Sequence, residues 1–149
     1  LGWHLQIFAP QEVIAQCVPV MARLAVPCVL DHVAMWRDAG CSGAASQTIL
    51  AAFGEGNLYI KLSASYRVPM SGPDLSSVVE RLAKTRLDRL LWASDWPHTS
   101  RKPGAPAQEL SPFRSIASEY LVSERNRWLG SGELLQAVCV DNPARLYRF

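Results

Sequence analysis

Residues 89–94, RLLWAS, form the most hydrophobic strand candidate of the sequence, and Asp95 follows them directly. Counting this strand, apolar strand candidates begin near residues 3, 28, 58 and 90, and a helical pattern fills each gap between them. This spacing is typical of repeated βαβ units. The near-continuous apolar character of the strands predicts a parallel sheet covered by amphipathic helices, which is an α/β fold.

The first helix is predicted to follow Pro10. Val13, Cys17, Met21 and Leu24 recur at helical spacing and are expected to form its buried face. Pro19 lies inside this pattern and lacks the N–H that the helical ladder needs. We therefore expect a kink or a break at Pro19.

Two further helices are predicted between the later strands. Residues 42–53 form one, with Ser42 as its N-cap and Gly54 as its stop. Asp74 is expected to cap the other. The predicted apolar face of that third helix consists of Leu75, Val78, Val79 and Leu82.

The length of 149 residues accommodates four such β/α units in one domain, residues 1–149, and no linker or internal repeat divides them. A complete (β/α)₈ barrel takes about 250 residues. The chain is therefore expected to form either an open parallel sheet or the later half of a barrel.

The charge balance narrows the class of partner. Fifteen Lys and Arg against 13 Asp and Glu give a net charge of +2, which is not that of a strongly basic nucleic-acid binder. Apolar runs fall far short of the ~20 residues that span a bilayer, so no membrane association is expected. Without a visible export signal, a cytoplasmic location is expected. The four cysteines lack CxxC spacing and are predicted to be reduced thiols and a poor zinc site.

Polar residues that could carry chemistry stand where the predicted strands end. The carboxyl ends of parallel strands form the edge at which α/β proteins place their sites. A carboxylate and an imidazole that converge there could activate water and polarise a carbonyl, or hold a divalent metal. The residues at these strand ends are Asp31, His32, Lys61, Ser63, Asp95 and His98.

Purely structural roles remain open for several of them. Asp95 could cap the turn before Pro97 through an Asx hydrogen bond. His32 could be a buried, satisfied histidine, and His98, in a loop, is expected to be exposed. His4 occupies a possible barrel-interior position early in the first strand.

Different surroundings and roles are expected for two basic residues. Lys61 lies within an apolar strand and should have a carboxylate or a bound anion near it, because an unpaired buried ammonium is costly. Arg67 is either a fork for a substrate carboxylate or a solvated arginine. The sequence contains no Gly-rich phosphate loop, GxSxG elbow or HExxH motif.

Four strings appear in one order along nearly the whole chain. They are VLDH at residues 29–32, LYIKLS at 58–63, LWASDWPH at 91–98 and DNPARLY at 141–147. In this order they resemble the amidohydrolase-related family of TIM-barrel hydrolases, in its 2-pyrone-4,6-dicarboxylate lactonase and sugar-lactone hydrolase branch. The resemblance covers only the C-terminal half of a family member.

The resemblance implies specific roles. Asp95 matches the catalytic aspartate of the last barrel strand, which activates the hydrolytic water, and His32 matches a histidine that polarises the scissile carbonyl or ligates a metal. Arg67 matches a substrate-carboxylate arginine. A substrate-binding shell is expected from Lys61, Ser63, His4 and His98.

The chain also departs from the family pattern. The first-strand His-x-His pair has no counterpart here, and Met35 stands where the lactonase branch tends to carry an arginine. Members of the family differ in metal use, so the expected cofactor is either none or a divalent metal such as zinc. His32 and Asp95 are its candidate ligands.

The sequence thus predicts a hydrolase that opens a lactone or similar cyclic ester of a carboxylated small molecule, with water activated at Asp95. One alternative is a non-catalytic half-barrel that needs a partner chain, which can be a second copy, because open parallel edges invite association. The other is a metal-dependent decarboxylase of the same superfamily.

Overall fold

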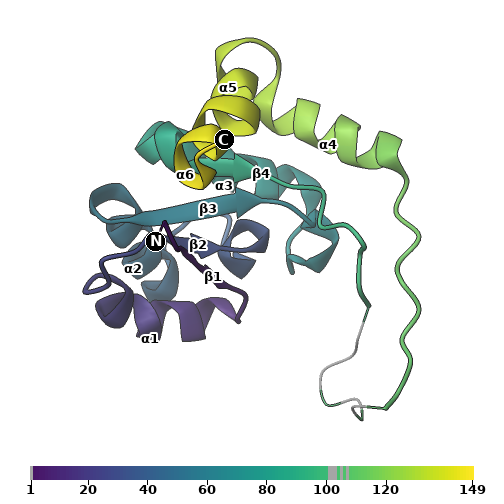
Figure 1. Ribbon diagram of the computed structural model, residues 1–149, viewed down its shortest axis with the longest axis horizontal. Helices are drawn as coiled ribbons and strands as arrows, with labels where there is room; N and C mark the ends of the chain where they lie inside the picture. Colours follow the sequence, from purple (N-terminus) through teal and green to yellow (C-terminus); the bar gives the residue numbers. More distant parts are fainter. Residues whose placement is uncertain (1, 101–103, 105, 107) are drawn as a thin grey trace.

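The sheet of the protein is four-stranded and entirely parallel. The computed structural model describes residues 2–100, 104, 106 and 108–149 (Figure 1). The strand order β1-β2-β3-β4 follows the sequence, which confirms the predicted parallel α/β fold. The strands are β1 (Leu5–Ile7), β2 (Cys28–Leu30), β3 (Leu58–Leu62) and β4 (Leu90–Trp92).

Helices connect each strand to the next and continue after the sheet (Figure 1). The crossovers are α1 (Gln11–Met21), α2 (Ala44–Glu55) and α3 (Gly72–Arg86). Between β4 and α4 (Ser118–Leu129) the described residues form no helix or strand. The chain continues after α4 with α5 (Glu133–Gln136), a π-helical turn (Ala137–Asp141) and α6 (Asn142–Tyr147). Short 3₁₀ turns stand at His32–Met35, Ser65–Arg67 and Leu87–Arg89.

The two faces of the sheet have different environments because successive strand residues point to opposite sides. One face packs with the crossover helices in the main core, to which Leu30, Ile60 and Phe53 belong, each with no exposed surface. The other face carries a smaller apolar cluster that includes Val29 and Tyr59. Polar residues of this second face lie toward the carboxyl ends of the strands, where the candidate site forms.

The buried face of α1 differs from the prediction. Ile14 and Met21 are buried, whereas Val13 and Cys17 are exposed. Of the kink or break predicted at Pro19, the break does not occur, because α1 runs to Met21 as one helix. Pro19 falls near the C-terminal end, where the missing N–H costs a single ladder bond.

The start and end of α2 are shifted from the predicted positions. The helix begins at Ala44 after Gly43, not at Ser42, and no side chain caps it. It ends at Glu55, and Gly56 rather than Gly54 follows it. The backbone N–H of Gly56 then bonds to the Ala52 carbonyl.

The third helix confirms the predicted face and corrects the cap. Ser71, not Asp74, precedes the helix. Asp74 lies in the first turn, where its carboxylate accepts a hydrogen bond from the Ser71 hydroxyl and faces the positive end of the helix dipole. The predicted apolar face is buried throughout: Leu75, Val78, Val79 and Leu82.

The edges of the sheet are β1 and β4, each paired with a single strand among the described residues. Large apolar side chains are exposed near both edges, with Trp3 71% and Trp96 80% accessible. Within the described residues, no helix combines the length and apolarity needed to cross a membrane. The cysteines are free thiols, as predicted.

Candidate active site

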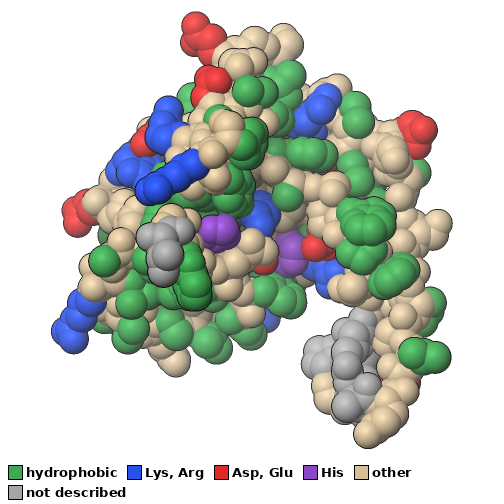
Figure 2. Space-filling model, in the orientation of Figure 1, with side chains coloured by type: hydrophobic (Ala, Val, Ile, Leu, Met, Phe, Trp, Pro, Cys, Tyr) green, Lys and Arg blue, Asp and Glu red, His purple; other side chains and the backbone are tan. Residues whose placement is uncertain are grey.

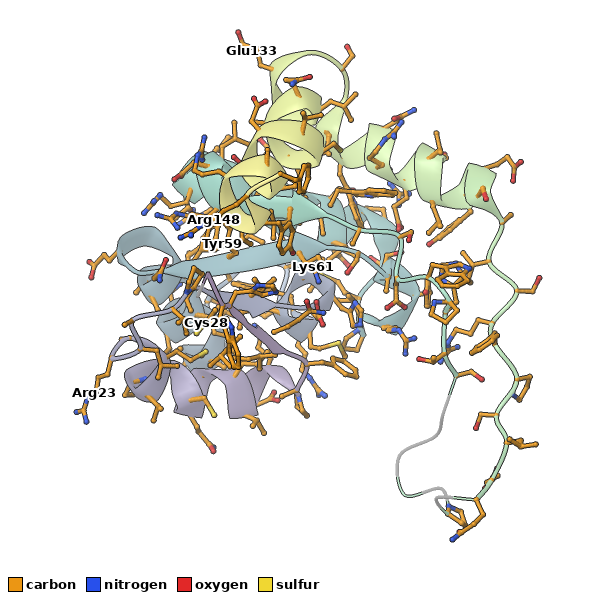
Figure 3. The ribbon with its side chains drawn as sticks, viewed as in Figure 1. Arg23, Cys28, Tyr59, Lys61, Glu133 and Arg148 are labelled. Carbon is orange, nitrogen blue, oxygen red and sulfur yellow. The ribbon has the colours of Figure 1, made fainter. Side chains whose placement is uncertain are left out.

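The carboxyl ends of the four strands bring most of the predicted site residues together. Figure 3 shows Lys61 on β3, nearer the C-terminal end of that strand than Tyr59. In the space-filling view, histidine, acidic and basic side chains gather in the middle of one face, surrounded by hydrophobic side chains (Figure 2). The cluster therefore opens onto the surface at the edge where α/β proteins place their sites.

Lys61 confirms the prediction of a charged partner. Its Nζ lies 3.0 Å from Asp31 Oδ1, and both side chains are nearly buried. Gln6, on β1, donates a hydrogen bond of 3.0 Å from Nε2 to the other carboxylate oxygen of Asp31. Gln6, Asp31 and Lys61 thus link β1, the end of β2 and β3, and the Asp31–Lys61 pair neutralises two charges that would be costly if either were buried alone.

Asp95 accepts two hydrogen bonds through one oxygen. Its Oδ2 receives the Tyr66 hydroxyl at 2.7 Å and Arg67 Nε at 2.8 Å. Burial alone would raise the pKa of Asp95, but the hydrogen bonds from Tyr66 and Arg67 and the positive charge of Arg67 outweigh it and lower that pKa below its usual value. The side chain is therefore an ionised carboxylate at neutral pH, with these bonds on one oxygen.

The second oxygen of Asp95 faces His32. His32 Nε2 lies 3.6 Å from Asp95 Oδ1, and His32 Nδ1 lies 2.9 Å from the Ser63 hydroxyl oxygen. Burial lowers the pKa of His32 below 6.5 and outweighs the opposite effect of Asp95, so the imidazole is neutral at neutral pH. The Phe8 ring packs edge-on against it, at 5.0 Å between centroids.

His98 is buried, at 8% exposure, so the expectation of an exposed loop histidine is wrong. Its Nδ1 lies 2.9 Å from the Tyr66 hydroxyl oxygen. Because the single Tyr66 proton is donated to Asp95, His98 Nδ1 is the donor in this contact. Burial together with Asp95 raises the pKa of Tyr66 well above its ordinary value of 10.

Tyr66 is the site residue that the sequence reasoning missed. Its position next to Arg67, after a strand end, was the available signal, but a tyrosine in a loop has no distinctive pattern. Arg67 itself is not solvated: besides Asp95, its Nη2 donates to the Thr99 carbonyl at 2.6 Å. The short turn after β3 therefore binds both Asp95 and the loop that follows it.

Several of these residues have left-handed backbone conformations. The φ angles of His32, Asp95 and His98 are 51°, 62° and 60°. Non-glycine residues pay about 1–2 kcal/mol for this conformation, and strain of this kind concentrates at functional sites. At His32–Met35 four successive residues share it, and the complete burial of Val33 holds the turn in place.

His4 lies apart from the cluster. It precedes β1, at the amino end of the strand, and its ring packs edge-on against Tyr147 with 5.2 Å between centroids. It shares the face of Gln6, as strand alternation requires, but stands two residues further from the carboxyl edge.

The described residues do not fit a metal site by themselves. No group of three or more His, Cys, Asp or Glu side chains among them is arranged to hold a metal ion. His32 and Asp95 are only two, and the Arg67 guanidinium on Asp95 would repel a cation beside it. A zinc site here would need ligands from outside these residues.

A parallel sheet with helical crossovers and polar side chains at its carboxyl edge is the arrangement of a β/α barrel, a fold that places its sites at that edge. The amidohydrolase family model matches residues 1–149, and the chain belongs to this family. The chain is 27% identical to a 2-pyrone-4,6-dicarboxylate hydrolase of Comamonas testosteroni, with 99% of this chain and 49% of that protein covered. It is 29% identical to a 4-sulfomuconolactone hydrolase of Rhizobium radiobacter, over 99% of this chain and 48% of that protein.

Solved structures confirm the fold. A probable 2-pyrone-4,6-dicarboxylic acid hydrolase of Acinetobacter baumannii, with citric acid bound, superposes with a TM-score of 0.78 at 21% identity, covering 99% of this chain and 53% of that one. A Burkholderia multivorans amidohydrolase with bound zinc gives a TM-score of 0.65 at 19% identity, with the same coverage. The chain spans about half the length of the relatives it matches and corresponds to the C-terminal half of a family barrel.

Proposed function

We propose that this chain supplies the water-activating side of a site that hydrolyses a lactone, or a similar cyclic ester, of a carboxylated small molecule. The observation that carries the proposal is the asymmetry of Asp95: Oδ2 accepts hydrogen bonds from Tyr66 and Arg67, while Oδ1 faces the His32 imidazole. An ionised carboxylate held in one orientation is suited to act as a general base.

In the proposed reaction, Asp95 Oδ1 takes a proton from a water molecule as the water oxygen bonds to the lactone carbonyl carbon. The carbonyl π electrons move onto its oxygen, and the acyl carbon–oxygen bond of the ring then breaks as the carbonyl re-forms. The proton held by Asp95 goes to the departing ring oxygen. The product is the ring-opened hydroxy acid, and Asp95 returns to its carboxylate form.

His32 is proposed to stabilise the oxyanion that forms in the first step. A neutral imidazole can do so only in the tautomer that carries its proton on Nε2, which requires Ser63 to donate its hydroxyl proton to Nδ1. The 2.9 Å contact between Ser63 and Nδ1 is compatible with that direction. Donors aimed at a developing oxyanion contribute strongly to acyl-transfer catalysis.

Two observations support a carboxylated substrate: the basic side chains near Asp95, and the acidic compounds named for similar proteins. Arg67 is proposed to anchor a substrate carboxylate through Nη1, because Asp95 takes its Nε donor and Thr99 takes Nη2, and Lys61 lies nearby on β3. The two curated relatives are named as hydrolases of a pyrone dicarboxylate and a sulfomuconolactone, and a solved relative holds citric acid. All three molecules named there bear acid groups.

The exposed edges of the sheet favour one alternative, a non-catalytic half-barrel that binds a partner. Trp3 and Phe8 beside β1 are 71% and 58% exposed, and a parallel edge leaves backbone groups available for pairing. On either proposal, β1 and β4 would pair with further strands, supplied by a second copy or by the remainder of a family barrel.

The test is hydrolysis of a panel of small lactones, with and without carboxylate groups, by size-separated fractions of wild type and Asp95→Asn. Loss of a general base typically costs about 10²- to 10⁴-fold in rate, and the proposal expects a loss in that range. An unchanged rate in Asp95→Asn overturns the assignment. The alternative of a metal-dependent decarboxylase is tested by repeating the assays with a strong chelator. The chelator would abolish the activity of such an enzyme, so activity that survives it excludes this alternative.

A further inference from the structure

Helix α4 contacts the turn that holds the candidate base, although 55 positions separate the two contacting residues. The Ser65 hydroxyl oxygen lies 2.8 Å from the Tyr120 hydroxyl oxygen. Tyr120 in turn donates a 3.0 Å hydrogen bond to Glu124 Oε1. Since Tyr120 has one hydroxyl proton, Ser65 is the donor to Tyr120, and the direction of both bonds is fixed.

Glu124 anchors this chain of hydrogen bonds. It is 5% exposed, which is unusual for a carboxylate, and Arg127 Nη2 lies 3.1 Å from the same Oε1 oxygen. A buried carboxylate is tolerated only when hydrogen bonds and a positive charge compensate for lost hydration. Tyr120, Glu124 and Arg127 recur at helical spacing, so one face of α4 presents all three.

Ser65, at the other end of this chain of hydrogen bonds, is the first residue of the turn Ser65–Arg67. Tyr66 and Arg67 of this turn donate to the same oxygen of Asp95. The turn follows Ala64, whose φ of 46° is a strained conformation for alanine. A strained turn with polar contacts on both sides is held in place by its surroundings, here Asp95 on one side and α4 on the other.

We propose that Tyr120 and Glu124 are positioning residues of the site, which hold Ser65 and thereby fix Tyr66 and Arg67 against Asp95. Neither side chain contacts Asp95 or His32 within the described network, so both act through the turn. Their effect on hydrolysis rests on the function proposed above, but their effect on the geometry of the turn does not. The two consequences can be measured separately.

The geometric consequence is tested by hydrogen exchange of the Arg67 Nε–H group, followed by NMR on the purified chain and assigned by its loss in Arg67→Lys. A hydrogen bond contributes about 0.5–1.5 kcal/mol, so Tyr120→Phe is expected to speed this exchange about 2- to 13-fold. Glu124→Gln keeps an acceptor oxygen for Tyr120 and is expected to have a smaller effect. Tyr120 is 43% exposed, so its replacement by phenylalanine should not unfold the chain.

Tyr147→Phe is the matched control, because it removes a tyrosine hydroxyl from a different helix, α6. Equal exchange rates in Tyr120→Phe and wild type overturn the proposal, and so does equal acceleration in Tyr147→Phe. In fractions that hydrolyse lactones, Tyr120→Phe is expected to raise KM several-fold for a carboxylated lactone and less for an uncharged one. If neither the chain nor its assembly with the remaining strands of a family barrel hydrolyses lactones, the proposed function is refuted, and the exchange result still decides the positioning role.

Discussion

His32 Nε2 and Asp95 Oδ1 face each other at 3.6 Å, slightly too far for a direct hydrogen bond. Both groups are largely buried, and the pKa of each is lowered. The result is a neutral imidazole beside an ionised carboxylate. These are the protonation states that a base and an oxyanion donor need at neutral pH.

The burial of His32 has a consequence for pH. Between its lowered folded pKa and the unfolded value of about 6.5, the unfolded chain binds more protons, so the free energy of unfolding falls as the pH drops below 6.5. Asp95 and Asp31 oppose the lowering, whereas Arg67 and Lys61 reinforce it.

We therefore expect urea midpoints to fall between pH 7 and pH 5 in wild type and to fall less in His32→Gln. His4→Gln is the control and should retain the wild-type loss. Parallel pH curves for wild type and His32→Gln would show that other groups cause the acid sensitivity.

Tyr66→Phe is expected to raise the pKa of Asp95 toward its ordinary value, because a hydrogen bond that favours the carboxylate is removed. The carboxylate would then be lost at a higher pH as acid is added, and the acid limb of any hydrolysis profile would shift to higher pH. Carbon-13 NMR titration of the Asp95 carboxyl group measures the change, with Tyr147→Phe as control. An unchanged Asp95 titration would mean that the Tyr66 hydrogen bond does not help to keep the carboxylate ionised.

The sequence predicted the strands and the carboxyl-edge location because strand spacing and apolarity are local signals. The burial of His98 could not be read in this way, since it depends on Tyr66, which lies 32 positions earlier. The face of α1 was misassigned for a different reason. Val13 and Ile14 are adjacent and both apolar, so the pattern leaves the phase of the helix ambiguous, and tertiary packing selects Ile14.

Core packing gives a stability prediction. Phe53, on α2, is fully buried in the main core, so Phe53→Ala is expected to lower the free energy of unfolding by about 3–5 kcal/mol. Phe149→Ala is the control, because it makes the same substitution at a side chain that is 82% exposed. It should leave the free energy of unfolding nearly unchanged. Urea denaturation measures both. Similar losses in the two variants would contradict the assignment of Phe53 to the core.

The Asp31–Lys61 pair allows a test of how buried charge is compensated. Asp31→Asn leaves the Lys61 ammonium, 12% exposed, without its carboxylate, and removing one partner of a buried pair costs about 3–5 kcal/mol. The double variant Asp31→Asn, Lys61→Met removes both charges and keeps an acceptor for Gln6, so it should recover most of that loss.

The control for this cycle is Lys84→Met, which disrupts the exposed pair with Glu80 on α3. Exposed pairs contribute little, so this variant should unfold at nearly the wild-type urea concentration. A double variant as unstable as Asp31→Asn alone would show that the lost stability comes from the Asp31 carboxylate itself and not from the stranded ammonium.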